Sequence, residues 1–181
     1  SDTSVSQEVI AAFKPFSASV ERLRALRSQL MLRCLNPDSE DRSLAIVSAE
    51  NGEGRSYIAA NLAVVFSQLG ERTLLIDADL RRPRQHQLFC LNNQSGLSAV
   101  LSGRAEPESV ISRIPHLLGL SVLPAGVVPP NPQELLARPT FSKLLEYARQ
   151  HYDVVLIDTP AAHTSDAETI ATRASAAIAI G

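Results

Sequence analysis

The sequence predicts an α/β fold in which a parallel β-sheet is covered by helices on both faces. Short, almost wholly apolar segments recur along the chain and alternate with longer segments of helical periodicity. Strands that are apolar on both sides are typical of a parallel sheet between two layers of helices. The expected strands cover residues 44–47, 73–76, 120–123, 154–157 and 176–181.

The segments between these strands predict helices. Apolar residues at helical spacing run over residues 55–69, and Gly70 then favours a helix end. Thr140 is expected to cap a later helix. The expected helices cover 55–69, shorter parts of 86–113, 140–150 and a segment from about residue 166, whereas the proline-rich segment 127–132 is expected to form a stiff loop.

An amphipathic helix is expected near the N-terminus, over residues 18–34, where apolar residues recur at helical spacing. The polar segment 36–41 separates this helix from the first strand. We therefore expect an N-terminal helical arm over residues 1–42 and an α/β domain over residues 43–181. Because the chain stops on an apolar strand that we expect to be buried, we also expect this domain to be truncated at its C-terminal end.

Composition excludes several classes of protein. The chain has 181 residues, of which 45% are hydrophobic and 20% charged, as is ordinary for a soluble globular protein. A net charge of -2 and an aromatic content of 4% argue against nucleic-acid binding. The two cysteines and four histidines are scattered, so neither a zinc site nor a disulfide is suggested, and a reducing cytoplasm is expected. No apolar run approaches the ~20 residues that span a bilayer.

A glycine-rich turn follows the first expected strand. Residues 49–56 match the phosphate-loop pattern [A/G]-x4-G-K-[S/T] except that Arg55 replaces the lysine. Gly52 and Gly54 allow the backbone to curl so that its N–H groups surround phosphate oxygens at a helix N-terminus. The hydroxyl of Ser56 is then placed to bind Mg²⁺. The alternative is a simple connection between a strand and a helix.

Aspartates end two further strands. The second strand leads into Asp77 and Asp79, and the strand 154–157 leads into Asp158, the Walker B arrangement in which a carboxylate holds Mg²⁺. For Asp77 and Asp79 the alternative is a solvated pair that forms a salt bridge with Arg81 or Arg82. Ligands bind at the carboxyl ends of parallel strands. The three strand ends together therefore predict one nucleotide site and a P-loop NTPase-like fold.

These three motifs resemble the Walker A, Walker A′ and Walker B motifs of bacterial tyrosine kinases (BY-kinases). The spacing of Glu21, Arg24 and Arg27 resembles the oligomerisation motif of that family. The resemblance covers about residues 18–181 and is nearest to the kinases of exopolysaccharide chain-length determinant systems. Further segments that look like family segments are 95–103, 123–126, 129–136, 158–160 and 166–167.

The resemblance implies an ATP- and Mg²⁺-dependent protein tyrosine kinase that autophosphorylates in trans and regulates exopolysaccharide synthesis, chain length or export. Asp77 would be the base or orienter for the tyrosine hydroxyl, assisted by Asp79, and Arg55 would act on the phosphoryl group. Mg²⁺ would be held by Ser56, Asp77 and Asp158. The nucleotide, ATP or ADP, would be bound by Asn51, Gly52, Glu53, Gly54, Arg55, Ser56 and Tyr57.

The resemblance also implies partners and a location. A membrane-anchored polysaccharide chain-length activator would complete the site with its cytoplasmic segment, and would hold the chain at the inner face of the bacterial cell membrane. A homo-oligomer would form through Glu21, Arg24 and Arg27. The alternative for these three residues is a solvent-facing charge ladder on one helix face.

Two other functions remain open on the sequence alone. A partitioning or septum-site type ATPase would have the same fold, but those proteins carry a second lysine early in the phosphate loop, where this chain has residues 49–51 as Ala-Glu-Asn. A catalytically weak ATP-binding scaffold of the polysaccharide machinery is favoured by Arg55. A dinucleotide-dependent oxidoreductase is disfavoured, because the third glycine of the G-x-G-x-x-G pattern is missing.

Replacement of Arg55 by lysine tests the phosphate-loop interpretation. Both side chains are cations, although the planar guanidinium binds phosphate differently from a compact ammonium. We expect Arg55→Lys to leave the ATP dissociation constant within about tenfold of the wild type, as measured by calorimetric titration. Complete loss of binding would mean that Arg55 has another role.

Overall fold

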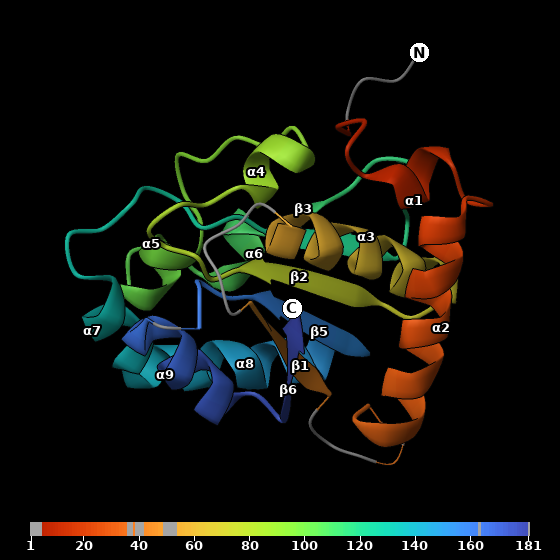
Figure 1. The fold of residues 1–181 in the computed structure, drawn as a ribbon. Coiled ribbons are helices and arrows are strands. Elements are labelled where there is room, and N and C mark those ends of the chain that lie inside the picture. Colours follow the sequence, from red (N-terminus) through yellow and green to blue (C-terminus); the bar gives the residue numbers. More distant parts are fainter. Residues whose placement is uncertain (1–4, 36–37, 39–41, 49–53, 163, 181) are drawn as a thin grey trace.

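The computed structural model describes residues 5–35, 38, 42–48, 54–162 and 164–180. Its six described strands form one sheet in the order β3-β4-β2-β5-β1-β6 (Figure 1). Neighbouring strands are parallel except for β3, which is antiparallel to β4. The predicted parallel sheet is therefore confirmed for five strands. The bounds are β1 Ser43–Ser48, β2 Thr73–Asp77, β3 Ser112–Arg113, β4 Leu120–Leu123, β5 Val154–Asp158 and β6 Ala176–Ile180.

Helices cover both faces of the sheet, as expected (Figure 1). Helices α1 to α4 contribute to one hydrophobic cluster, and α5, α7, α8 and α9 contribute to the other. The bounds are α1 Ile10–Phe13, α2 Ala18–Arg33, α3 Gly54–Gln68, α4 Gln85–Leu88, α5 Leu97–Leu101, α6 Pro107–Val110, α7 Pro132–Ala137, α8 Pro139–His151 and α9 Ser165–Arg173. No helix in this described part of the chain is long and apolar enough to cross a membrane.

Successive residues of the central strands face opposite helical layers. In β1, Leu44 and Ile46 belong to the cluster under α3, whereas Ala45 belongs to the cluster under α8. The same alternation separates Leu75 from Leu74 in β2. This is the period of two that a pleated strand imposes, and it explains why apolar residues follow one another without alternation in the central strands β1, β2 and β5.

The last strand differs from its prediction. Residues 176–181 were expected to form a buried core strand, but β6 pairs with β1 at one edge of the described sheet. Ala177 and Ala179 are exposed there, and Ala176 and Ile178 are half-buried. An apolar run of this length fits a half-covered edge strand as well as a central one.

Two helix starts also differ from their predictions. The proline-rich segment leads into α7, whose first residue is Pro132, and α8 begins at Pro139. Proline is favoured in the first turn of a helix because its fixed φ suits the helix and its missing N–H costs nothing there. Thr140 does not cap α8, since its hydroxyl donates to the carbonyl oxygen of Leu101 (2.8 Å).

The N-terminal arm packs on α3 rather than standing apart from the α/β domain. Val20 and Leu30 of α2 are buried in the same cluster as the strand residues Leu44 and Ile46. Arg27 donates through Nη1 to the carbonyl oxygen of Val65 in α3 (2.6 Å). The arm and the sheet therefore share one core.

A buried asparagine of α3 holds α1 in place. The Oδ1 of Asn61 accepts a hydrogen bond from the backbone N–H of Ala11 (2.9 Å). Its Nδ2 donates to the carbonyl oxygens of Glu8 (3.1 Å) and Tyr57 (2.9 Å). Because Asn61 is fully buried, water cannot replace these bonds.

Removal of this amide tests how firmly the arm is anchored. We expect Asn61→Ala to lower the free energy of unfolding by about 3 kcal/mol, because buried backbone groups lose their partners. Urea denaturation measures the change, with Gln87→Ala on the exposed face of α4 as a control. The anchoring role would be wrong if both variants lost similar stability.

Candidate functional site

The three strand ends singled out in the sequence lie together at one end of the sheet, where the parallel strands have their carboxyl ends. This end of the sheet is the edge referred to below. Asp77 and Asp158 are direct partners in the parallel register of β2 and β5. Strand β1 flanks β5 on its other side, with Ile46 opposite Asp158. Helix α3, which follows β1 in the chain, brings Ser56 to this edge. The predicted convergence of Ser56, Asp77 and Asp158 is therefore present.

Ser56 and Asp158 are directly hydrogen-bonded. The Ser56 hydroxyl donates to Oδ2 of Asp158 (2.8 Å), and both side chains are buried. The same carboxylate oxygen accepts a hydrogen bond from Nε2 of Gln85 (2.9 Å). The Ser56 hydroxyl in the first turn of α3 and the Asp158 carboxylate at the end of β5 are therefore close enough to bind the same metal ion.

The Asp77 carboxylate accepts hydrogen bonds from the segment that follows β2. Its Oδ1 accepts from the N–H of Asp79 (3.1 Å), and its Oδ2 accepts from the N–H groups of Arg84 (3.1 Å) and Gln85 (3.0 Å). Burial and the nearby charge of Asp158 raise the pKa of Asp77 well above its usual value, and the backbone donors oppose this rise. Asp77 therefore binds a proton more readily than an exposed aspartate.

Asp79 organises the next turn of the same segment. Its Oδ1 accepts hydrogen bonds from the N–H groups of Arg81 (3.2 Å) and Arg82 (3.0 Å), and the residue is 5% exposed. Since Asp77 is fully buried, the alternative of a solvated aspartate pair is wrong.

Arg81 forms its ion pair with a residue that was not expected. Its Nε donates to Oδ2 of Asp166 (2.7 Å), in the first turn of α9. Asp166 is fully buried, and its hydrogen bond and charge raise the pKa of Arg81. In the sequence, Asp166 lies in a segment that resembles the kinase family, but no role was predicted for it. No sequence feature pointed to Gln85.

Part of the predicted nucleotide site lies outside the described residues. Nothing is described for Asn51, Gly52 and Glu53, or for the side chain of Arg55. Gly54 is the first residue of α3 and is exposed, and Tyr57 is half-buried.

The donor set at this edge fits a magnesium nucleotide. Hydroxyl and carboxylate oxygens are the ligands that Mg²⁺ prefers, and it is usually held by one or two carboxylates together with phosphates. A cation beside Asp77 and Asp158 would offset the repulsion that raises the pKa of Asp77. Ser56, Asp77 and Asp158 are the described side chains at this edge that could hold such a cation.

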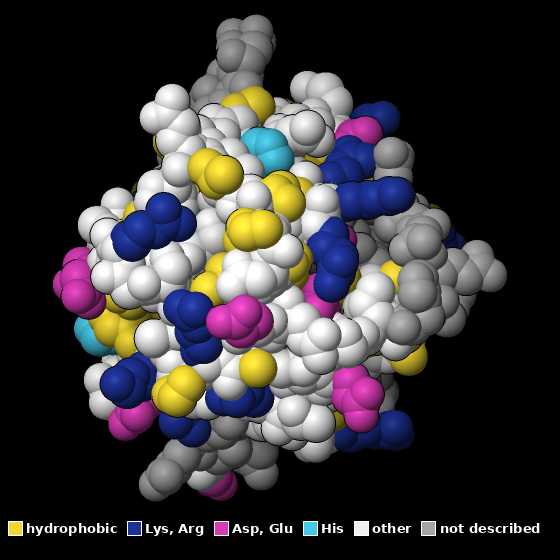
Figure 2. Space-filling view, turned by 90° about the vertical axis from the view of Figure 1, so that its left-hand side faces the viewer, with side chains coloured by type: hydrophobic (Ala, Val, Ile, Leu, Met, Phe, Trp, Pro, Cys, Tyr) yellow, Lys and Arg dark blue, Asp and Glu magenta, His cyan; other side chains and the backbone are white. Residues whose placement is uncertain are grey.

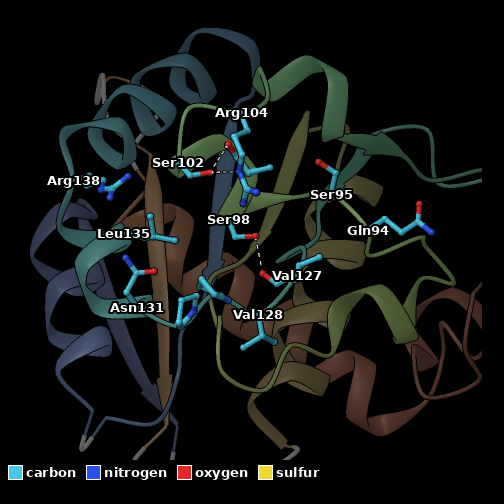
Figure 3. Close-up of a pocket in the computed structure, with 13 residues that line it drawn as sticks. Gln94, Ser95, Ser98, Ser102, Arg104, Val127, Val128, Asn131, Leu135 and Arg138 are labelled. Atoms are coloured by element: carbon cyan, nitrogen blue, oxygen red, sulfur yellow. Dashed lines mark hydrogen bonds between the residues drawn. The ribbon is translucent and has the colours of Figure 1, made fainter.

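A pocket of about 550 Å³ lies between α5, the loop that precedes α7, and α7 itself (Figure 3). Arg104 and Arg138 line it, and none of its described lining residues is acidic. Asp77, Asp79 and Asp158 are not among its described lining residues, so the pocket is separate from the carboxylate cluster. The molecular face in Figure 2 carries Lys and Arg side chains scattered among hydrophobic and acidic ones.

Comparison with known proteins identifies the family. A model of the AAA domain family matches residues 41–179. The chain is 40% identical over 159 residues to the putative tyrosine-protein kinase CapB of Staphylococcus aureus, covering 87% of this chain and 68% of CapB. It is similar to the structure of the kinase domain of Escherichia coli tyrosine kinase ETK, with a TM-score of 0.90, 37% identity, and coverage of 96% and 67%.

A different ATPase shares the fold. The septum site-determining protein MinD of Pyrococcus horikoshii, whose structure was solved in complex with Mg-ADP, is 27% identical, with a TM-score of 0.66 and coverage of 77% and 57%. The chain spans only 20% of the full-length Etk of Escherichia coli. Because the AAA model covers most of the chain and CapB matches it over two thirds of its own length, the chain belongs to the AAA domain family and, within it, to the bacterial tyrosine kinases.

Proposed function

We propose that this chain is the catalytic domain of a tyrosine kinase that uses Mg²⁺ and ATP, autophosphorylates in trans, and regulates exopolysaccharide synthesis, chain length or export. The observation that carries the proposal is the hydrogen bond between Ser56 and Asp158 beside the buried carboxylate of Asp77. The names of CapB and Etk as tyrosine kinases support the reaction. The MinD complex with Mg-ADP supports the cofactor.

Residues 51–57 would hold the phosphates at the N-terminus of α3. This helix has 15 residues, so its N-terminal N–H groups and dipole favour bound anions. Ser56 and Asp158 would hold Mg²⁺, which supplies charge neutralisation for phosphoryl transfer. Arg55 would stabilise negative charge on the phosphoryl group, as a fixed cation does in such sites.

Asp77 would orient the incoming tyrosine hydroxyl and accept its proton, with Asp79 assisting. A general base works best when its pKa lies near the operating pH. Burial and Asp158 shift the pKa of Asp77 in that direction. The bonds from Asp79, Arg84 and Gln85 hold its carboxylate in one orientation, which supports a positioned catalytic group.

Partners and location follow from the family and remain proposals. The activator would be a membrane-anchored chain-length protein whose cytoplasmic segment completes the site at the inner face of the cell membrane. The three tyrosines of the chain, Tyr57, Tyr147 and Tyr152, are half-buried. Acceptor tyrosines are therefore expected on another segment or subunit.

The arm would join subunits through Glu21, Arg24 and Arg27. Glu21 and Arg24 form an ion pair (2.5 Å) in which the Glu21 side chain is 62% exposed. Arg27 donates a hydrogen bond to the carbonyl oxygen of Val65 in its own chain. Glu21 and Arg24 are therefore the better placed of the three to meet a neighbouring subunit.

A catalytically weak ATP-binding scaffold is the second candidate. The observation that favours it is Arg55 in place of the usual phosphate-loop lysine, because guanidinium and ammonium bind phosphate with different geometry. Both candidates bind ATP, and only the kinase forms phosphotyrosine.

Phosphotyrosine formation from Mg·ATP separates the two candidates. We expect Asp77→Asn to lower the transfer rate by about a hundredfold or more, because it removes the general base. The rate is measured on a tyrosine-bearing acceptor peptide, with the activator's cytoplasmic segment present.

ATP affinity and thermal unfolding are measured as controls, because asparagine offers a single acceptor oxygen to the three backbone N–H groups that Asp77 binds, so the loss of transfer has to exceed any loss of folded, ATP-binding protein. No transfer by the wild type, with ATP still bound, would support the scaffold. Equal transfer by both proteins would mean that Asp77 is not the base.

Charge reversal tests the oligomer. We expect Glu21→Arg together with Arg24→Glu to weaken self-association by about tenfold or more, because the reversed pair no longer complements an unchanged neighbouring surface. Sedimentation velocity over a concentration series measures this change. The reversed pair can still form within α2, so stability should change by less than about 0.5 kcal/mol. A wild type that stays monomeric at every concentration would contradict the proposal.

A further inference from the structure

Gln85 connects all three strand ends of the site, although no sequence motif includes it. It is the first residue of α4 and is fully buried. Its backbone N–H donates to Oδ2 of Asp77 (3.0 Å). Its side-chain Nε2 donates to Oδ2 of Asp158 (2.9 Å) and to the carbonyl oxygen of Ser56 (2.9 Å).

The orientation of the Gln85 amide is fixed by these contacts. Both partners of Nε2 are acceptors, a carboxylate and a carbonyl oxygen, so the amide cannot be turned to place Oε1 there. Oε1 therefore has a defined position in the same planar group, next to the Ser56–Asp158 pair. It is buried and has no hydrogen-bond partner among the residues that the structure describes.

A buried amide oxygen without a partner costs about 1–3 kcal/mol, and such groups are rare in folded proteins. The two hydrogen bonds that Gln85 donates within the fold use only the Nε2 end of its amide, so they leave Oε1 unexplained. Mg²⁺ keeps several of its waters when it binds protein and phosphate. An amide oxygen beside the proposed ligands offers an acceptor to this hydration shell.

We propose that Gln85 is a positioning residue for magnesium binding at this site. Its Nε2 fixes the Asp158 carboxylate relative to the first turn of α3. Its Oε1 accepts a hydrogen bond from a water molecule bound to the cation. The inference rests on the proposed function, in that the site binds a magnesium nucleotide. Gln85 acts in this proposal through its contacts to Ser56 and Asp158.

The test compares ADP binding with and without Mg²⁺. Calorimetric titration of the whole chain with ADP, once in excess Mg²⁺ and once in EDTA, gives the gain in affinity that Mg²⁺ provides. We expect Gln85→Met to reduce this gain by about tenfold or more, as changes next to metal ligands do. Affinity in EDTA should stay within about twofold of the wild type, because the phosphate loop is unchanged.

Gln87→Met is the matched control, since Gln87 lies on the same short helix but is exposed, and it should keep the full gain. Gln85→Asn provides a second variant if Gln85→Met unfolds, because it keeps an amide that is one methylene too short to reach both acceptors. We expect it to lose the gain as well.

Three outcomes would overturn the role of Gln85. An unchanged magnesium gain in both Gln85 variants would show that the amide does not influence the cation. An equal loss of affinity with Mg²⁺ and in EDTA would show that Gln85 only supports the fold. A wild type without any magnesium gain would refute the proposed magnesium site itself, which is a distinct failure.

Discussion

Two carboxylates buried side by side are the constraint on which the rest of this site depends. Asp77 and Asp158 are register partners in adjacent parallel strands, and neither is exposed to solvent. Burial and the neighbouring charge of Asp158 disfavour the charged form of Asp77 and raise its pKa. Charge in such a place must be met by hydrogen-bond donors or by a counterion. The fold supplies the donors, and a bound cation would supply the rest.

The donors to Asp77 come from the segment that directly follows β2, whereas the donors to Asp158 are the distant residues Ser56 and Gln85. The segment after β2 turns back on Asp77, so that the N–H groups of residues 79, 84 and 85 point at its carboxylate. Arg81 of the same segment pairs with the buried Asp166 of α9. In the proposed mechanism, the hydrogen bonds that satisfy the buried Asp77 carboxylate in the fold would also orient it toward the tyrosine hydroxyl. Changes in this segment are therefore expected to affect stability and catalysis together.

The sequence could predict the structural features that require a particular type of residue at each position. Strands buried on both sides are mostly apolar, and aspartates at the ends of two of them located the carboxylate pair. The sequence could not locate Gln85, because an amide in a polar segment follows no pattern, nor the short strand β3 (Ser112–Arg113), which is polar. It also predicted a buried strand where β6 is a half-exposed edge, since apolar content does not record which strand lies outermost. Helix α7 was missed because prolines suggest a loop even where they begin a helix.

Helix α3 connects the arm to the site, and this connection bears on what an oligomer could do. Ser56 lies in its first turn, while Asn61 in its middle holds α1 and Val65 in its second half accepts the Arg27 bond. Because α3 contacts the arm at both Asn61 and Val65, it sets the separation between the arm and the phosphate-loop end of the site. A neighbouring subunit that docks on the arm would then be placed at a fixed distance from Ser56. Phosphorylation in trans needs such a fixed placement, because transfer depends chiefly on positioning of the acceptor.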